Sequence, residues 1–135
     1  MSALNTQQGG THYISEYQPI EFINDYNLNY VQGNILKYVV RHKKKNGVED
    51  LKKAMHYCEL GQTLKFKRTS VWDGDKSGKV NRFIIVNGMR NPVGMRFMWQ
   101  LCLNHLDVVK KLIDELIEEE YGEQQIGRAS CRERV

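Results

Sequence analysis

The sequence predicts an α+β fold that is mainly helical, with a helical core, a β-hairpin and a long C-terminal helix through which the chain forms a homo-oligomer. Three observations support this prediction. Apolar residues recur at helical spacing between residues 19 and 60. A turn-rich segment separates two strand-like runs at 71–72 and 80–86. Two apolar stripes run along residues 92–121.

The chain has 135 residues, which is enough for one domain. Residues 1–10 are rich in Ser, Asn, Gln and Gly, and we expect them to be disordered. Residues 126–135, Ile-Gly-Arg-Ala-Ser-Cys-Arg-Glu-Arg-Val, back-translate in frame to a common sequencing adapter. We interpret this tail as adapter read-through that is not native. The single predicted domain therefore spans residues 11–125.

The predicted helical core has three helices, at residues 19–26, 30–45 and 48–60. Pro19 is typical of a first helical residue, and Asn46-Gly47 ends the second helix. Glu49 and Asp50 lie in the first turn of the third helix, where negative charge is favoured. Because the connection is short, the second and third helices should fold back on each other. The basic end of one then lies beside the acidic start of the other.

After a basic connector at 61–70, the pattern changes. Val71-Trp72 and Val80–Val86 are strand-like, and the turn-rich segment between them predicts a β-hairpin. A single helix is then expected from Pro92 to Tyr121. Its first apolar stripe consists of Phe97, Leu101, His105, Val108, Leu112 and Leu116, and its second of Met98, Cys102, Val109 and Ile113. A helix that is apolar over this width has partners on two sides, so we expect the second stripe to lie between subunits.

The net charge of +4 includes three arginines and one glutamate of the tail, without which 17 basic and 15 acidic residues leave +2. This excess is too small for duplex nucleic acid. Residues 37–68 are basic and residues 114–123 acidic, which favours contact between subunits as readily as ligand binding. The cysteines, Cys58, Cys102 and Cys131, fit neither a disulfide framework nor a zinc site. No apolar run is long enough to span a membrane, so we expect a cytoplasmic protein.

Three segments resemble metal-binding or phosphate-binding motifs, but each lacks a residue or a spacing that the motif requires. We therefore expect no metal and no cofactor. The turn at 74–80 resembles a P-loop, but its glycines are one residue too close and Val80 replaces the magnesium-binding hydroxyl. A calcium loop starting at Asp73 would place Ile84 at its bidentate position. Glu115 and Glu118 could form half of a magnesium site, but the facing pair would have to be Glu49 and Asp50, which already have a structural explanation.

The strongest candidate site is the cationic end of the second helix. At helical spacing, Lys37, Tyr38 and Arg41 share one flank. Arg binds phosphate in a bidentate manner, Lys acts as a point charge, and Tyr can stack on a base. A solvated charged face is the alternative explanation. The predicted ligand-binding residues from this region are Asn34, Lys37, Tyr38, Arg41, His42 and Lys45.

Several separated motifs occur in an order that resembles a known protein family. They are Thr11-His12-Tyr13, residues 18–23 (Gln-Pro-Ile-Glu-Phe-Ile), residues 33–38 (Gly-Asn-Ile-Leu-Lys-Tyr), and residues 49–54 (Glu-Asp-Leu-Lys-Lys-Ala) with Tyr57. In this order they resemble a family of small phage proteins long described as of unknown function, one branch of which is a nucleotide kinase without a P-loop. The resemblance covers about residues 11–60. It implies a phage origin and a nucleotide-like ligand, and it adds His12 and Tyr13 to the predicted ligand contacts.

We therefore expect a phage protein, active in the host cytoplasm, that sequesters a nucleotide-derived immune signal of the host as an anti-defence protein. The alternative is a phage nucleoside monophosphate kinase that lacks a P-loop. A third, weaker hypothesis is a protein that blocks a host enzyme by direct contact. Phosphoryl transfer requires positioning of two substrates and stabilisation of charge on the transferred group. The sequence offers one cationic cluster, which favours binding over catalysis.

Overall fold

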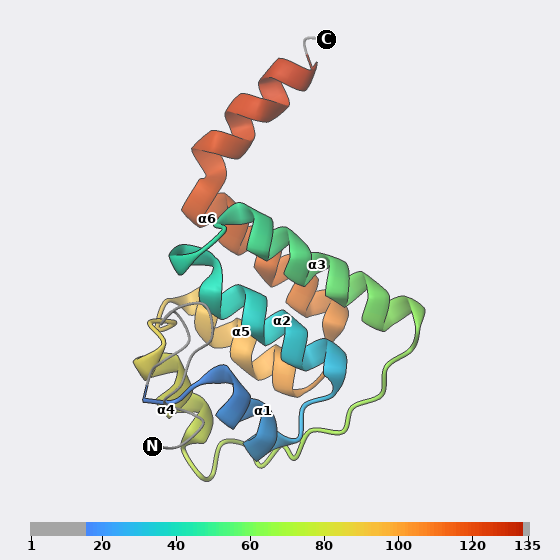
Figure 1. Ribbon diagram of the computed structural model, residues 1–135, viewed down its shortest axis with the longest axis vertical. Coiled ribbons are helices and arrows are strands. Elements are labelled where there is room, and N and C mark those ends of the chain that lie inside the picture. Colours follow the sequence, from blue (N-terminus) through green and yellow to red (C-terminus); the bar gives the residue numbers. More distant parts are fainter. Residues whose placement is uncertain (1–15, 134–135) are drawn as a thin grey trace.

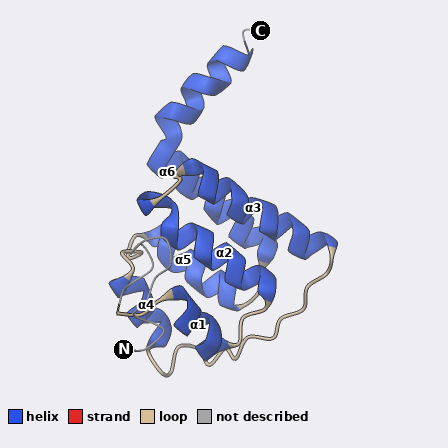
Figure 2. Cartoon of the chain, viewed as in Figure 1, coloured by secondary structure: helices blue, strands red, loops and turns tan. Residues whose placement is uncertain are grey.

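The computed structural model describes the backbone of residues 16–133 and the side chains of residues 16–122. Over this range the chain is helical and contains no strand (Figure 2). The elements are α1 (Pro19–Tyr26), α2 (Tyr30–Arg41), the 3-10 helix η2 (His42–Lys44), α3 (Val48–Thr63), α4 (Lys79–Val86), α5 (Pro92–Cys102) and α6 (Leu106–Glu133). None of the described helices is both long and apolar enough to cross a bilayer. The predicted α+β class is wrong, and the fold is all-helical.

The first three helices confirm the predicted core. Helix α1 has the predicted bounds, α2 gives way to η2 at His42, and α3 continues to Thr63. At the start of α2, Asn29 and Gln32 form a reciprocal capping box in which each side chain accepts a backbone N–H of the other at 2.8 Å. Gly47, before α3, has a positive φ of 59°, as expected of the glycine that ends the turn.

Four helices, α2, α3, α5 and α6, form the core of the molecule (Figure 1). Helix α3 packs between α2 and α6, and α5 packs against α6 and α2, while α1 contacts α2 and α4 contacts α5. The fully buried side chains of these four helices include Ile35, Leu36, Leu51, Met98, Leu101 and Ile113, and α1 and α4 add Phe22 and Phe83. This packing fixes α2 and α3 side by side, so the outer surfaces of the two helices form one face.

The predicted β-hairpin is replaced by an irregular segment and helix α4. Val80, Phe83 and Ile84 are buried at helical spacing, so the apolar run fits a helix that packs on the core. The Asp75 carboxylate accepts the N–H groups of Val80 at 2.9 Å and Asn81 at 3.2 Å, which caps the first turn of α4. The β-branched composition of residues 80–86 suggested a strand, but burial on one helical face outweighed that propensity.

The predicted helix from Pro92 to Tyr121 is two helices joined by a tight turn. Asn104 adopts a left-handed φ of 59°, and the chain reverses there so that α5 and α6 pack on each other. His105, expected on the core stripe, is exposed in this turn. Val109 and Ile113, from the second stripe, are fully buried within the same chain. The second stripe is therefore buried without a second subunit. The homo-oligomer stays a prediction, and the width of the apolar surface no longer supports it.

Helix α6 changes direction at Tyr121, whose φ of −133° is not helical. Beyond this kink the helix leads away from the four-helix core (Figure 1). The side chains of the predicted adapter segment, residues 126–135, lie outside the described residues, as does the segment 1–10.

Candidate functional site

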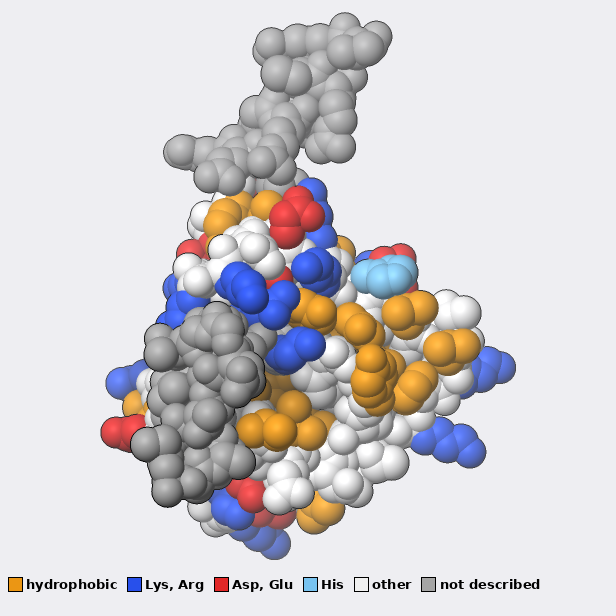
Figure 3. Space-filling view, in the orientation of Figure 1, with side chains coloured by type: hydrophobic (Ala, Val, Ile, Leu, Met, Phe, Trp, Pro, Cys, Tyr) orange, Lys and Arg blue, Asp and Glu red, His pale blue; other side chains and the backbone are white. Residues whose placement is uncertain are grey.

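The outer surfaces of α2 and α3 form one aromatic and cationic face. Positions 30 and 38 of α2 lie two turns apart on one side of the helix, and Lys53 and Tyr57 are one turn apart on α3. Figure 3 shows hydrophobic side chains gathered over α2 and α3 beside lysine and arginine side chains. We call this surface the tyrosine–lysine face, and it consists of Tyr30, Lys37, Tyr38, Arg41, Lys53 and Tyr57.

Three tyrosine rings lie in a row on this face. The Tyr57 ring lies between the other two, with its centroid 5.9 Å from that of Tyr38 and 6.2 Å from that of Tyr30. The Tyr38 and Tyr57 planes differ by 21°, and the Tyr30 and Tyr57 planes by 67°. Tyr30 is 68% exposed. A hydrogen bond with Tyr30, together with burial, raises the pKa of Tyr57, so its phenol is neutral at neutral pH.

Three cations surround the Tyr38 ring. The distance to the ring centroid is 4.6 Å for Lys37 Nζ, 4.5 Å for the Arg41 guanidinium carbon and 5.5 Å for Lys53 Nζ. These are cation–π distances. Within the described side chains, neither Lys37 nor Lys53 forms an ion pair with a carboxylate. Their charge is therefore available to an anion on this face.

The third cation, Arg41, has a carboxylate partner. Arg41 Nη2 lies 3.1 Å from Asp50 Oδ1, and the Asp50 side chain is fully buried. Asp50 also accepts the backbone N–H of Asn46 at 3.2 Å. Burial by itself would raise the pKa of Asp50, but the hydrogen bonds from Arg41 and Asn46 hold it below its usual value. Arg41 thus contributes charge to the tyrosine–lysine face while it joins α2 to α3.

The other predicted residues take different positions. Asn34 is on α2 one turn after Tyr30, and its amide donates to the Tyr30 carbonyl at 2.8 Å. Lys45 is exposed beyond η2. His12 and Tyr13 lie outside the described residues. Of the predicted residues, Lys37, Tyr38 and Arg41 are the ones that the structure brings together on this face.

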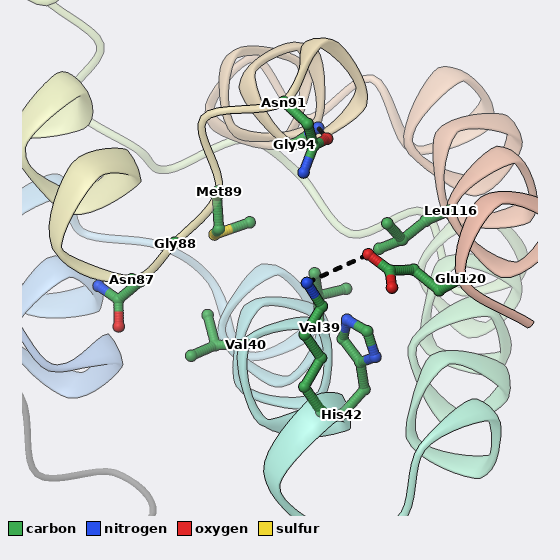
Figure 4. Close-up of a pocket in the computed structure, with 11 residues that line it drawn as sticks. Val39, Val40, His42, Asn87, Gly88, Met89, Asn91, Gly94, Leu116 and Glu120 are labelled. Atoms are coloured by element: carbon green, nitrogen blue, oxygen red, sulfur yellow. Dashed lines mark hydrogen bonds and ion pairs between the residues drawn. The ribbon is translucent and has the colours of Figure 1, made fainter.

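His42 does not belong to this face. It is buried, and its Nδ1 lies 2.8 Å from the Tyr121 hydroxyl. The His42 side chain lines a hollow of about 40 Å³. Its ring points toward α6 and lies beside Glu120 (Figure 4). That volume is far below the roughly 300 Å³ of a small ligand pocket. Burial lowers the pKa of His42, so the imidazole is neutral at neutral pH and is a poor partner for phosphate.

A larger hollow, of about 410 Å³, lies between α5 and α6 and is acidic. It is lined by Val93, Arg96, Asp114, Glu115, Glu118 and Glu119. Arg96 reaches Glu115 at 3.8 Å, and the remaining carboxylates would repel a phosphate. Asp50, the hypothetical facing carboxylate of a magnesium site, is bonded to Arg41 instead. Among the described residues, no three His, Cys, Asp or Glu side chains are grouped so that they could hold a metal ion.

Three members of the tyrosine–lysine face, Tyr30, Lys53 and Tyr57, were not predicted as ligand contacts. The four-residue step from Lys53 to Tyr57 and the eight-residue step from Tyr30 to Tyr38 were visible in the sequence. Which side of α3 meets α2 was not visible, because that depends on how α3 packs between α2 and α6. The row of tyrosines is a consequence of that packing.

Residues 7–59 match the model of a protein family described as a protein of unknown function, DUF3310. No curated protein and no solved structure matches the chain significantly. The matched segment contains α1, α2 and most of α3, and all six residues of the tyrosine–lysine face lie within it. The family description gives neither an activity nor a source.

Proposed function

We propose that the protein binds a nucleotide or a nucleotide-derived small molecule on the tyrosine–lysine face. The observation that carries this proposal is the juxtaposition of the exposed Tyr30 ring and the half-buried Tyr57 ring with Lys37 and Lys53, which have no carboxylate partner among the described side chains. A base can stack on the Tyr57 or Tyr30 ring, and the two ammonium groups can bind its phosphate.

The proposed biological role is sequestration without turnover. The ligand would be a nucleotide-derived immune signal of the host, captured in the host cytoplasm by a phage protein. Support for this role comes from the cationic cluster of the tyrosine–lysine face and from the resemblance of residues 11–60 to small phage proteins. The same resemblance supports the alternative, a nucleoside monophosphate kinase without a P-loop. The two proposals share a binding site and differ in whether a product forms.

Calorimetric titration with AMP, GMP, dTMP, cyclic nucleotides and ADP-ribose tests binding directly. Lys53→Ala should weaken binding roughly 2- to 10-fold, because one partly screened phosphate contact is lost. Lys111→Ala, which removes an exposed lysine of α6, is the matched control and should leave the affinity unchanged. Absence of binding to all of these ligands would refute the proposal.

A second assay separates sequestration from catalysis. The protein is incubated with ATP, magnesium and each nucleoside monophosphate, and separately with each nucleotide alone. Recovery of the intact nucleotide after heat denaturation of the complex supports sequestration. Steady formation of nucleoside diphosphate identifies a kinase and overturns the sequestration proposal.

A further inference from the structure

The tyrosine–lysine face offers two separate surfaces for stacking. The Tyr30 and Tyr57 planes differ by 67°, so one planar base cannot lie flat on both rings. The Tyr38 ring already contacts three cations and Tyr57. Tyr30, in contrast, is 68% exposed and extends the row away from the cations. A ligand with a single base would leave one of these two rings unused.

We infer that this face binds two bases joined by a phosphodiester, with one base on Tyr57 and the other on Tyr30. The inference rests on the proposed function and specifies the class of ligand. Two sources can supply this chemistry, namely a free dinucleotide and a segment of single-stranded nucleic acid.

The spacing of the rings fits bases that are spread apart. The Tyr30 and Tyr57 centroids are 6.2 Å apart, whereas bases in a duplex strand rise by about 3.4 Å. A duplex also keeps both faces of each base stacked on its neighbours. Aromatic side chains that separate and stack successive bases are typical of single-strand recognition. Duplex nucleic acid is thus the wrong shape for this face.

The positions of the cations give the ligand a direction. Lys37 and Lys53 are at the Tyr38 end of the row, and Tyr30 precedes Tyr38 by eight helical residues, which is about 12 Å along α2. A terminal phosphate therefore binds at Lys37 and Lys53, the adjacent base lies on Tyr57, and the second base reaches Tyr30.

The test compares 5′-phosphorylated dinucleotides, pdTpdT and pdApdA, with dTMP and dAMP by calorimetry at one salt concentration. The second stacked base should make each dinucleotide bind roughly 5- to 150-fold more tightly than its mononucleotide. Tyr30→Ala should remove this advantage, so that each dinucleotide then binds no more tightly than its mononucleotide. Tyr30→Phe, which keeps the ring, should retain the advantage. Tyr30 is exposed, so these variants should fold, and circular dichroism checks that they do.

The outcomes separate this inference from the proposed function. Equal affinity for dinucleotide and mononucleotide, or an equal loss for both in Tyr30→Ala, overturns the two-base inference and leaves nucleotide binding intact. Failure of every nucleotide to bind overturns both. If the dinucleotide binds more tightly than the mononucleotide, titration with (dT)10 shows whether the natural ligand is a free dinucleotide or a single strand. After correction for the overlapping dinucleotide registers of (dT)10, binding no tighter than that of pdTpdT assigns a free dinucleotide, and tighter binding assigns a single strand.

Discussion

The Arg41 guanidinium lies 3.1 Å from a carboxylate oxygen of Asp50, and this pair joins the end of α2 to the first turn of α3. The Arg41 side chain is 12% exposed and that of Asp50 is fully buried. Asn46, in the connection between the helices, donates its backbone N–H to the same carboxylate. The corner beside the tyrosine–lysine face is therefore held by a charge pair that water hardly reaches.

Arg41→Ala should destabilise the protein by about 3–5 kcal/mol, because it leaves the Asp50 charge buried without its partner. Urea unfolding followed by circular dichroism measures the change. Lys44→Ala is the control, because Lys44 is exposed at the same corner, and its effect should stay within about 0.5 kcal/mol. A fully stable Arg41→Ala protein would show that the pair contributes little to the fold. Binding data on Arg41 variants must therefore be read beside their stability.

The buried His42 should make stability depend on pH. Burial lowers its pKa in the folded state, so the unfolded chain binds the proton more strongly. Stability from this group is present in full above the unfolded pKa of about 6.5 and falls as pH drops toward the lower folded pKa. Glu120 opposes this shift and Lys43 adds to it. Urea unfolding between pH 5 and 8 should show the loss.

His42→Gln should reduce the pH dependence between pH 5 and 7, even if the variant is less stable overall. His56→Gln is the matched control, because His56 is exposed on α3, and it should keep the parental slope. If both variants keep the same slope as the parent, His42 is not the titrating group.

The cap of α4 provides a test of the helix that replaces the predicted hairpin. Asp75→Ala removes the acceptor of the Val80 and Asn81 N–H groups and should destabilise the protein by about 1 kcal/mol or more. Asp75 has a positive φ of 61°, which Asn tolerates better than Ala. Asp75→Asn also keeps one acceptor oxygen, so it should destabilise less in urea unfolding. Equal effects of the two variants would argue against capping by this side chain.

The helical core was predictable because its local signals agree with its packing. Pro19 and the Asn46-Gly47 turn mark boundaries that the structure keeps. The prediction from the sequence was wrong where local composition and packing disagree. Residues 80–86 contain three β-branched apolar residues beyond Val80, yet burial of Val80, Phe83 and Ile84 makes them helical. Asn104 looked compatible with a continuous helix, because nothing local shows that it adopts a left-handed conformation.

The part of the candidate site on α2 was predictable from the sequence, and the part on α3 was not. Spacing along α2 correctly grouped Lys37, Tyr38 and Arg41. The contributions of Lys53 and Tyr57 depend on the rotation of α3 against α2, which no local signal fixes. His42 was misplaced for a different reason. The change to η2 at that residue turns its ring toward α6, where it meets Tyr121.

Tyr38 should act by positioning cations. Its ring lies within 4.5–5.5 Å of the charged groups of Lys37, Arg41 and Lys53. Each exposed cation–π contact is worth about 0.5–1 kcal/mol, so replacing the ring releases the ammonium groups into more conformations. Tyr38→Leu should therefore weaken dTMP binding roughly 2- to 5-fold for each ammonium group released, since about 1.4 kcal/mol corresponds to a tenfold change in affinity. Tyr38→Phe keeps the ring and should bind within about twofold of the parent.

Calorimetry at low and raised salt measures both Tyr38 variants, with melting temperatures as the check on folding. Raised salt should weaken binding to the parent and to Tyr38→Phe alike, because the phosphate contact is electrostatic. It should weaken Tyr38→Leu less, since fewer cations are held at the phosphate. If Tyr38→Leu binds as tightly as Tyr38→Phe, with the same salt dependence, the ring does not organise the cations. Lys37 and Lys53 would then bind phosphate independently of it.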